Sequence, residues 1–90
     1  MIDKVHIIGL GLMGTNLGIK LVEKGILVSG TDILEKNVVR AKEYGALNNE
    51  FDSEDNYDLT ILSMPINEII SFFDSDFTLI KTKLIMDLGG

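Results

Sequence analysis

Three glycines near the amino terminus restrict the fold of this chain more than any other feature of its sequence. Gly9, Gly11 and Gly14 follow a G-x-G-x-x-G spacing, and they come directly after the apolar run of residues 5–8. A helical pattern begins within the same segment and continues beyond it. A strand that enters a glycine-rich turn and then a helix is typical of the phosphate-binding turn of a dinucleotide-binding fold.

Each glycine has a separate role in such a turn. Gly9 ends the strand where a Cβ would clash, and Gly11 lets the backbone approach a pyrophosphate closely. Gly14 lies in the first helical turn, where a side chain would hold the helix away from the strand. The free N–H groups at Leu12 and Met13 then face the phosphates, and the positive end of the helix favours their charge.

A pattern as short as G-x-G-x-x-G also occurs by chance in glycine-rich turns. The sequence around the glycines therefore decides how strongly the motif indicates a phosphate-binding turn. After the turn, apolar residues repeat at helical spacing, at Met13, Leu17, Leu21 and Val22. Gly25 ends this helix, and a second apolar run, residues 26–31, ends on Asp32. An acid about 20 residues beyond the glycines completes the dinucleotide fingerprint.

Asp32 has two interpretations. At the end of a second strand its carboxylate accepts hydrogen bonds from both ribose hydroxyls of an adenosine, and its charge repels a 2′-phosphate. This interpretation favours NAD over NADP as the cofactor. The alternative is that Asp32 caps the helix that follows, a role for which aspartate is also well suited.

Strand and helix patterns alternate through the next part of the chain. Residues 34–44 show helical spacing and end at a glycine. The inward positions of this helix are Val38, Val39 and Ala41. A short edge strand is expected at residues 46–48, and residues 49–56 are expected to form a polar loop.

The last third of the chain contains two further strand patterns. Residues 57–63 form a strong one, which Met64-Pro65 ends because proline cannot extend a hydrogen-bonded ladder. A short helix should follow and carry Ile66, Ile69, Ile70 and Phe73. Residues 77–83 favour a half-turn or loop, and residues 84–88 form the last strand before Gly89-Gly90.

This alternation predicts a Rossmann-type α/β fold, a doubly wound parallel sheet of about five strands in the order 3-2-1-4-5, forming one small domain over residues 1–90. In such a sheet the ligand lies at the carboxyl ends of the strands, where the winding reverses. Three segments distant in sequence meet at that edge. The candidate cofactor-binding residues are Gly9, Gly11, Leu12, Met13, Gly14, Asp32, Ser63, Met64 and Pro65.

Composition excludes several other classes of protein. The chain has 46% hydrophobic residues, enough for a folded core, and no cysteine for disulfides or thiolate chemistry. Its formal net charge is −6, which excludes the basic patch that nucleic-acid binding needs, and the acidic residues 50–58 are expected to form a solvated loop. No signal peptide and no apolar run long enough for a membrane span is present, so a cytoplasmic protein is expected.

The sequence offers no catalytic set. His6 is the single histidine, and it lies inside the first strand pattern, away from the carboxyl edge, so we interpret it as a packed structural residue. The acids show no metal-ligand spacing, and no Ser/His/Asp set can be assembled. We therefore expect neither a catalytic residue nor a metal site in these residues.

Four segments together resemble the nucleotide-binding domain of the prephenate and arogenate dehydrogenase family. They are residues 7–14, Asp32 after Gly30-Thr31, residues 58–66 ending in Met64-Pro65-Ile66, and residues 86–89. They resemble less closely the 3-hydroxyisobutyrate and 6-phosphogluconate dehydrogenases. The resemblance implies an NAD(P) site at the glycine turn, Asp32 and residues 63–65, and an enzyme that oxidatively decarboxylates a cyclohexadienyl substrate on the route to tyrosine.

The same resemblance implies that parts of the enzyme lie elsewhere. The family's catalytic histidine lies beyond the last strand present here, and a helical domain that completes the active site and the dimer comes later. The family also tends to have Asp-x-Gly-Ser where this chain has Asp87-Leu88-Gly89-Gly90, and Gly90 cannot donate a hydroxyl. We therefore expect NAD binding without turnover, and a substrate domain or a second copy as partner.

A non-catalytic alternative stays open at this point. Nucleotide-sensing modules that regulate potassium channels and transporters also begin with an apolar strand, G-x-G-x-x-G and an acid after the second strand. They usually have a Gly-Asp-Ala-Thr-like turn, which residues 48–52 do not show, and they lack the Met-Pro ending. A fold retained only for protein contacts is a further alternative.

Overall fold

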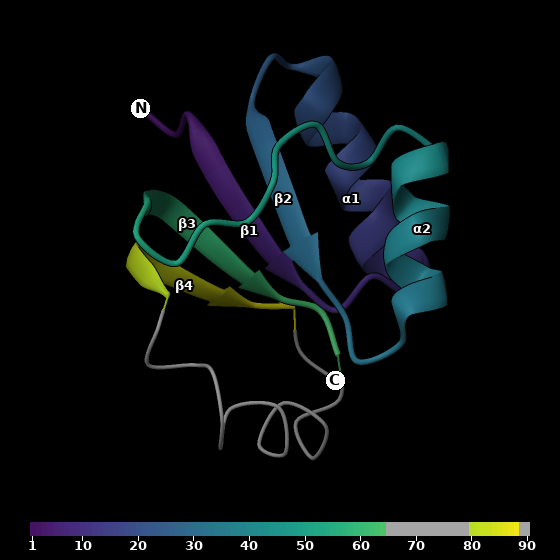
Figure 1. The fold of residues 1–90 in the computed structure, drawn as a ribbon. Helices are drawn as coiled ribbons and strands as arrows, with labels where there is room; N and C mark the ends of the chain where they lie inside the picture. The colour runs from purple at the N-terminus through teal and green to yellow at the C-terminus, as the bar shows by residue number, and fades with distance from the viewer. Residues whose placement is uncertain (65–79, 89–90) are drawn as a thin grey trace.

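A computed structural model describes residues 1–64 and 80–88 as a parallel sheet with two helices (Figure 1). The elements are β1 (Lys4–Ile8), α1 (Leu12–Glu23), β2 (Leu27–Thr31), α2 (Glu35–Glu43), β3 (Asn56–Leu62) and β4 (Lys81–Asp87). The helix expected after Pro65 and the terminal Gly89-Gly90 lie outside the described residues.

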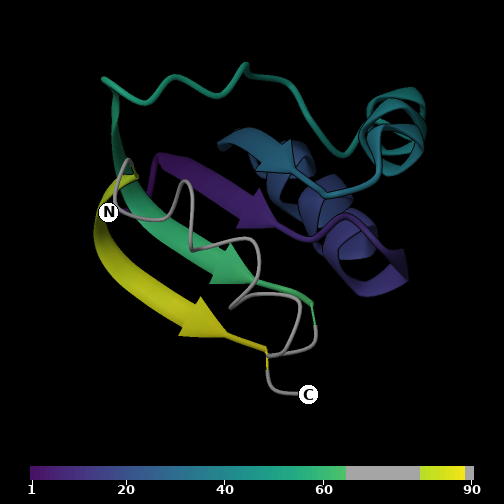
Figure 2. The ribbon, with the colours of Figure 1, turned by 60° about the horizontal axis from the view of Figure 1, so that its bottom comes forward.

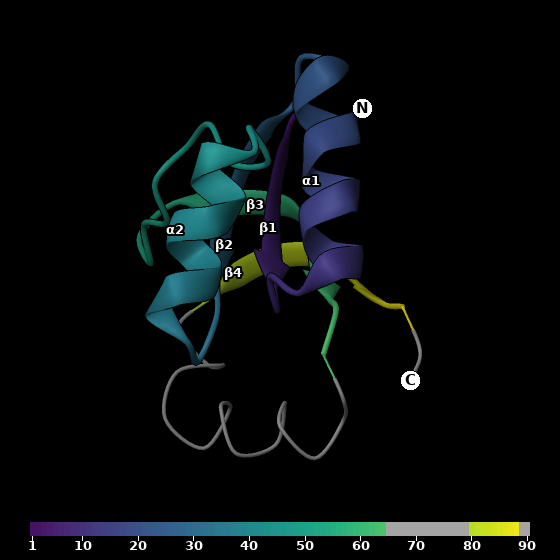
Figure 3. The same cartoon turned by 90° about the vertical axis from the view of Figure 1, so that its right-hand side faces the viewer.

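The four described strands form one sheet in the order β2-β1-β3-β4, with every pair parallel. Figure 2 shows the four arrows pointing the same way. Both helices cover the same face of the sheet (Figure 3), where Ala41 of α2 joins the core formed by β1 and β2. The predicted Rossmann-type α/β fold is confirmed. The four described strands have the predicted order, and the difference is the strand that was expected on the outer side of β2.

The predicted edge strand at residues 46–48 is absent, so the described sheet has four strands where about five were expected. The segment does lie beside β2, because the N–H groups of Asn48 and Asn49 both donate to the carbonyl of Val28, each at 3.0 Å. The side chain of Asn48 makes the other hydrogen bonds to this part of the chain, in place of backbone groups. Its Oδ1 accepts from the Val28 N–H at 2.7 Å, and its Nδ2 donates to the Ile26 carbonyl at 3.1 Å.

Other differences concern the ends and faces of elements. β4 begins at Lys81, inside the segment for which a half-turn or loop was expected. Val39 and Met13, placed inward by helical spacing, are 47% and 59% exposed. These helices cover the sheet with narrow apolar stripes, and side chains at the margin of a stripe extend into solvent.

The core lies between the helices and the sheet. Alternate strand residues such as Val5, Ile7 and Ile61 are fully or almost fully buried there. Gly18 in α1 allows close packing, because a Cβ at this position would lie 2.6 Å from the carbonyl oxygen of Ala46. The first turn of α1 packs closely on the residue that follows β1, because a Cβ on Gly14 would meet the carbonyl oxygen of Gly9.

Candidate dinucleotide site

The turns that follow β1, β2 and β3 meet at one edge of the sheet. Ile8, the last residue of β1, pairs with Thr31 and Leu62, the last residues before the other two turns. Hydrogen bonds carry the ladder one residue further, since the Gly9 N–H donates to Thr31 at 2.8 Å and the Ser63 N–H donates to Ile8 at 2.8 Å. The predicted convergence of the three segments at the carboxyl edge is therefore present.

The glycine turn is closed on one side and open on the other. Gly9 has a φ of 100°, and a Cβ there would lie 2.6 Å from the Ser63 carbonyl oxygen. A Cβ on Gly14 would collide with the Gly9 carbonyl oxygen and lie 3.1 Å from Ser63 Oγ. In contrast, a Cβ on Gly11 would have no neighbour within 4 Å, so this backbone borders free space.

The start of α1 presents donors toward that space. Gly11 is the N-cap residue, and it provides no side-chain cap for the helix. The first helical bond runs from the Thr15 N–H to the Gly11 carbonyl at 3.0 Å, so the N–H groups of Leu12, Met13 and Gly14 have no acceptor in the preceding turn. Because no acid lies in this first turn, the positive end of the helix keeps its potential for an anion.

Asp32 ties the glycine turn to the start of α2. Its Oδ2 accepts from the Leu10 N–H at 2.7 Å. Its Oδ1 accepts from the Leu34 N–H at 2.9 Å and from Nδ2 of Asn37 at 3.3 Å. The capping interpretation of Asp32 is wrong, since Leu34 is the N-cap of α2 and no side chain caps this helix. Asp32 instead bonds to the turn before α2, and its carboxylate borders the groove described next.

A groove of about 310 Å³ runs along this edge. It is lined by Gly9, Gly11, Asp32, Ile33, Leu34, Asn37, Ser63 and Met64. Five of the predicted site residues are in that set, while Leu12 and Met13 are exposed at the adjacent start of α1 and Gly14 is buried beneath the turn. Pro65, the ninth predicted residue, lies outside the described part of the chain.

The groove fits a dinucleotide in three respects. Open space at Gly11 leaves room for a pyrophosphate, and the uncapped start of α1 supplies backbone donors. Asp32 supplies a carboxylate for the ribose. Apolar side chains of Ile33, Leu34 and Met64 line the rest, as a nucleobase requires.

Sequence reasoning missed Asn37 and Arg40. Asn37 bonds to Asp32, and Arg40 donates to Oδ1 of Asn37 at 3.1 Å and to the Leu10 carbonyl at 3.5 Å. A signal for Asn37 was present, because it is the third residue of α2, from which a side chain reaches back over the helix entry. Arg40 gave no such signal, because its helical spacing predicts only an exposed position, and it is exposed.

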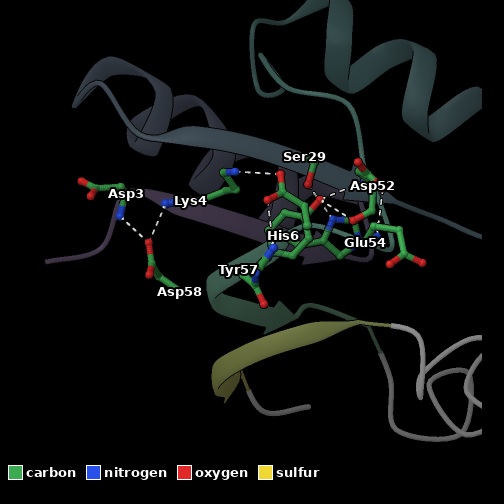
Figure 4. A network of polar contacts seen from close by, with 10 residues as sticks. Asp3, Lys4, His6, Ser29, Asp52, Glu54, Tyr57 and Asp58 are labelled. Carbon is green, nitrogen blue, oxygen red and sulfur yellow. Dashed lines mark hydrogen bonds and ion pairs between the residues drawn. The ribbon is translucent and has the colours of Figure 1, made fainter.

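His6 lies on the sheet face opposite the core and is fully buried, as its structural interpretation requires (Figure 4). Its Nδ1 is 2.7 Å from Ser29 Oγ, its Nε2 is 3.2 Å from Thr31 Oγ1, and its ring lies 4.4 Å from that of Phe51. Burial lowers the pKa of His6 to about 4. The imidazole is not among the groove residues.

Part of the acidic stretch at residues 50–58 is structural rather than a solvated loop. Asp58 accepts from the backbone N–H groups of Asp3 and Lys4 at 2.8 and 3.0 Å, and these bonds lower its pKa (Figure 4). Lys4 Nζ lies 2.7 Å from Asp55 Oδ2. These contacts join β1 to β3 at the amino edge of the sheet, at the opposite end from the groove.

Within residues 1–64 and 80–88, no three His, Cys, Asp or Glu side chains gather closely enough to hold a metal ion. Neither described helix has the length and apolar character that crossing a bilayer requires.

The parallel sheet, the glycine turn and the acid after β2 define a dinucleotide-binding domain of the Rossmann type. The family model described as the NAD binding domain of 6-phosphogluconate dehydrogenase matches residues 4–75. The chain belongs to this family of NAD-binding domains. A search of the curated proteins found no match.

Solved structures share the fold. Synechocystis arogenate dehydrogenase superposes with a TM-score of 0.78 at 21% identity, over 96% of this chain and 32% of its own. Mycobacterium tuberculosis 3-hydroxyisobutyrate dehydrogenase, solved with L-serine, gives 0.77 at 22% identity, over 97% and 31%. Prephenate dehydrogenase from A. aeolicus, in complex with hydroxyphenyl propionate and NAD+, gives 0.75 at 18%, over 97% and 34%. The chain thus spans about a third of each structure, and its resemblance to prephenate and arogenate dehydrogenases is confirmed for the fold.

Proposed function

We propose that this chain is the NAD-binding domain of an oxidoreductase of the prephenate and arogenate dehydrogenase type. The observation that carries the proposal is the groove in which the open Gly11 turn and the Asp32 carboxylate lie together. The family match and the shared fold support it. When bound, NAD would supply the hydride acceptor for the oxidation of a cyclohexadienyl substrate in tyrosine biosynthesis.

The preference for NAD over NADP is part of the proposal. Asp32 borders the groove and is fixed there by the backbone N–H groups of Leu10 and Leu34. A fixed carboxylate accepts hydrogen bonds from a ribose but repels a 2′-phosphate, since the two negative charges would lie within a few ångströms of each other. Arg40 donates to Asn37 and to the Leu10 carbonyl, so its guanidinium is held by hydrogen bonds beside the glycine turn.

We further propose that these 90 residues bind the cofactor without oxidising substrate by themselves. The single histidine is buried on the far side of β1 from the helices, between Ser29 and Thr31. A general base must reach the proton that it removes, and His6 does not line the groove. The cytoplasmic location expected from the sequence stays a prediction.

A covering partner belongs to the same proposal, either a substrate domain or a second copy of the chain. β4 is an outer strand of the described sheet, and its residues Leu84, Ile85 and Met86 are 60%, 50% and 45% exposed. Exposed apolar side chains on an outer strand favour association. Light scattering on the isolated chain distinguishes the two, because only self-association raises its mass.

Calorimetric titration with NAD and, separately, NADP tests the cofactor assignment. We expect NAD to bind more tightly than NADP, and Asp32→Ala to weaken NAD binding by about 10- to 100-fold, because hydrogen bonds to a charged group are lost. Asp3→Ala removes an exposed acid at the amino edge and serves as the matched control, with unchanged affinity expected. Equal affinity of the Asp32→Ala variant and the wild type for NAD would contradict the assignment.

A further inference from the structure

The hydrogen bonds of Asp32 leave it less acceptor capacity than two ribose hydroxyls require. A carboxylate has about four lone-pair positions, two on each oxygen. On Oδ1 both are engaged, by the Leu34 N–H at 2.9 Å and by Asn37 Nδ2 at 3.3 Å. On Oδ2 one is engaged, by the Leu10 N–H at 2.7 Å. One acceptor position therefore remains for a hydroxyl of the ribose.

Asn37 has the capacity that Asp32 lacks. The orientation of its amide is set from both sides, because Asp32 only accepts and the Arg40 guanidinium only donates. Its Nδ2 therefore faces Asp32 and its Oδ1 faces Arg40, at 3.1 Å. One N–H and one lone pair of the amide remain available, and the residue lines the groove beside Asp32.

We propose that Asp32 and Asn37 form a two-residue ribose site, in which each side chain bonds one of the two hydroxyls of the adenosine ribose. This inference rests on the proposed binding of a dinucleotide in the groove, and it revises the expectation that Asp32 accepts both hydroxyls. Asn37 is a binding residue in this account. Arg40, which does not line the groove, is a positioning residue that holds the amide of Asn37 in the required orientation.

The contacts form a closed ring that links the ribose site to the phosphate turn. Leu10 donates through its N–H to Asp32 and accepts through its carbonyl from Arg40 at 3.5 Å. Between them, Asn37 joins Asp32 to Arg40. Because Leu10 lies between Gly9 and Gly11, Asp32 and the α2 residue Arg40 both bond to the backbone of the phosphate turn.

Titration of variants with NAD and with two analogues, carrying 2′-deoxyadenosine and 3′-deoxyadenosine, tests the two-residue site. Asn37→Ala is expected to bind NAD about five- to tenfold more weakly, the loss of one hydrogen bond. For the analogue that lacks the hydroxyl bound by Asn37, the variant and the wild type should have equal affinity. Likewise, Asp32→Ala and the wild type should have equal affinity for the other analogue.

Two further variants separate binding from structure. Lys36→Ala changes the neighbouring exposed residue of α2 and should leave all affinities unchanged. Arg40→Ala should show the analogue pattern of Asn37→Ala with a smaller loss, about two- to threefold, because the amide is then free to turn. Thermal unfolding of each variant establishes that it is folded before it is titrated.

The outcomes distinguish this inference from the function on which it rests. If Asn37→Ala binds NAD and both analogues more weakly by one common factor, Asn37 acts only on the structure of α2, and the two-residue site is overturned. If Asn37→Ala binds NAD as the wild type does while Asp32→Ala binds it weakly, the ribose site consists of Asp32 alone. If the wild type binds no NAD, the proposed function and the ribose site are both overturned.

Discussion

Gly9→Ala is expected to lower the free energy of unfolding by about 2–5 kcal/mol, through strain in a left-handed backbone and overpacking. The φ of Gly9 is 100°, and the new Cβ would lie 2.6 Å from the Ser63 carbonyl oxygen, which is backbone and cannot turn aside. Urea unfolding of the variant and the wild type measures the change. A midpoint equal to that of the wild type would show that the turn does not have this geometry.

Gly11→Ala is the matched control for this turn and is expected to behave in the opposite way. No atom lies within 4 Å of its added Cβ, and the residue has an ordinary extended backbone, so stability should change by less than about 1 kcal/mol. The methyl group would instead occupy the space proposed for a pyrophosphate. Affinity for NAD should fall at least about tenfold, or 1.4 kcal/mol. Unchanged NAD affinity would show that the pyrophosphate does not lie beside Gly11.

Stability is expected to fall as the pH is lowered from 7 to 5, and His6 is the cause. Burial lowers its pKa from 6.5 to about 4, so between these values the unfolded chain binds a proton that the folded chain does not. Stability then rises with pH across this window and is lost as the pH falls through it. At pH 5 the loss relative to neutral pH should be about 2 kcal/mol, measured by urea unfolding at each pH.

His6→Gln isolates this contribution, because glutamine does not titrate. The variant is expected to be less stable at neutral pH, where it loses the ring contact with Phe51 and a ring nitrogen contact with Ser29 or Thr31. Its stability should change little between pH 7 and pH 5. If the two proteins lose stability in parallel over this range, the buried imidazole is not the titrating group.

Local sequence patterns were sufficient to predict most of the described sheet. β1, β2 and β3 end within one residue of the predicted positions, because apolar runs bounded by glycine, aspartate or Met-Pro show directly where a buried strand stops. Residues 46–48 were mistaken for a strand because the segment lies where a strand would. Its contact with β2 combines two backbone N–H groups on one carbonyl with the side chain of Asn48, an arrangement that no hydrophobic pattern encodes.

The candidate site was predictable where a backbone requirement selects the residue. Gly9 and Asp32 are at positions that the topology of the fold prescribes, so their spacing was enough to place them at one edge. Asn37 and Arg40 were not predictable as site residues. Their roles depend on how α2 is rotated over the glycine turn, and on hydrogen bonds between side chains that only the assembled structure brings together.

Amide chemical-shift mapping during titration with NAD shows directly whether the carboxyl edge of the sheet is the dinucleotide site. The largest changes in the ¹⁵N–¹H spectrum are expected at Gly11, Leu12 and Met13 and in the turn after Asp32. Amides at the amino edge, such as Lys4 and Asp58, should stay in place and provide the internal control. Changes gathered at that amino edge, or no changes at a large excess of NAD, would show that NAD does not bind at the carboxyl edge.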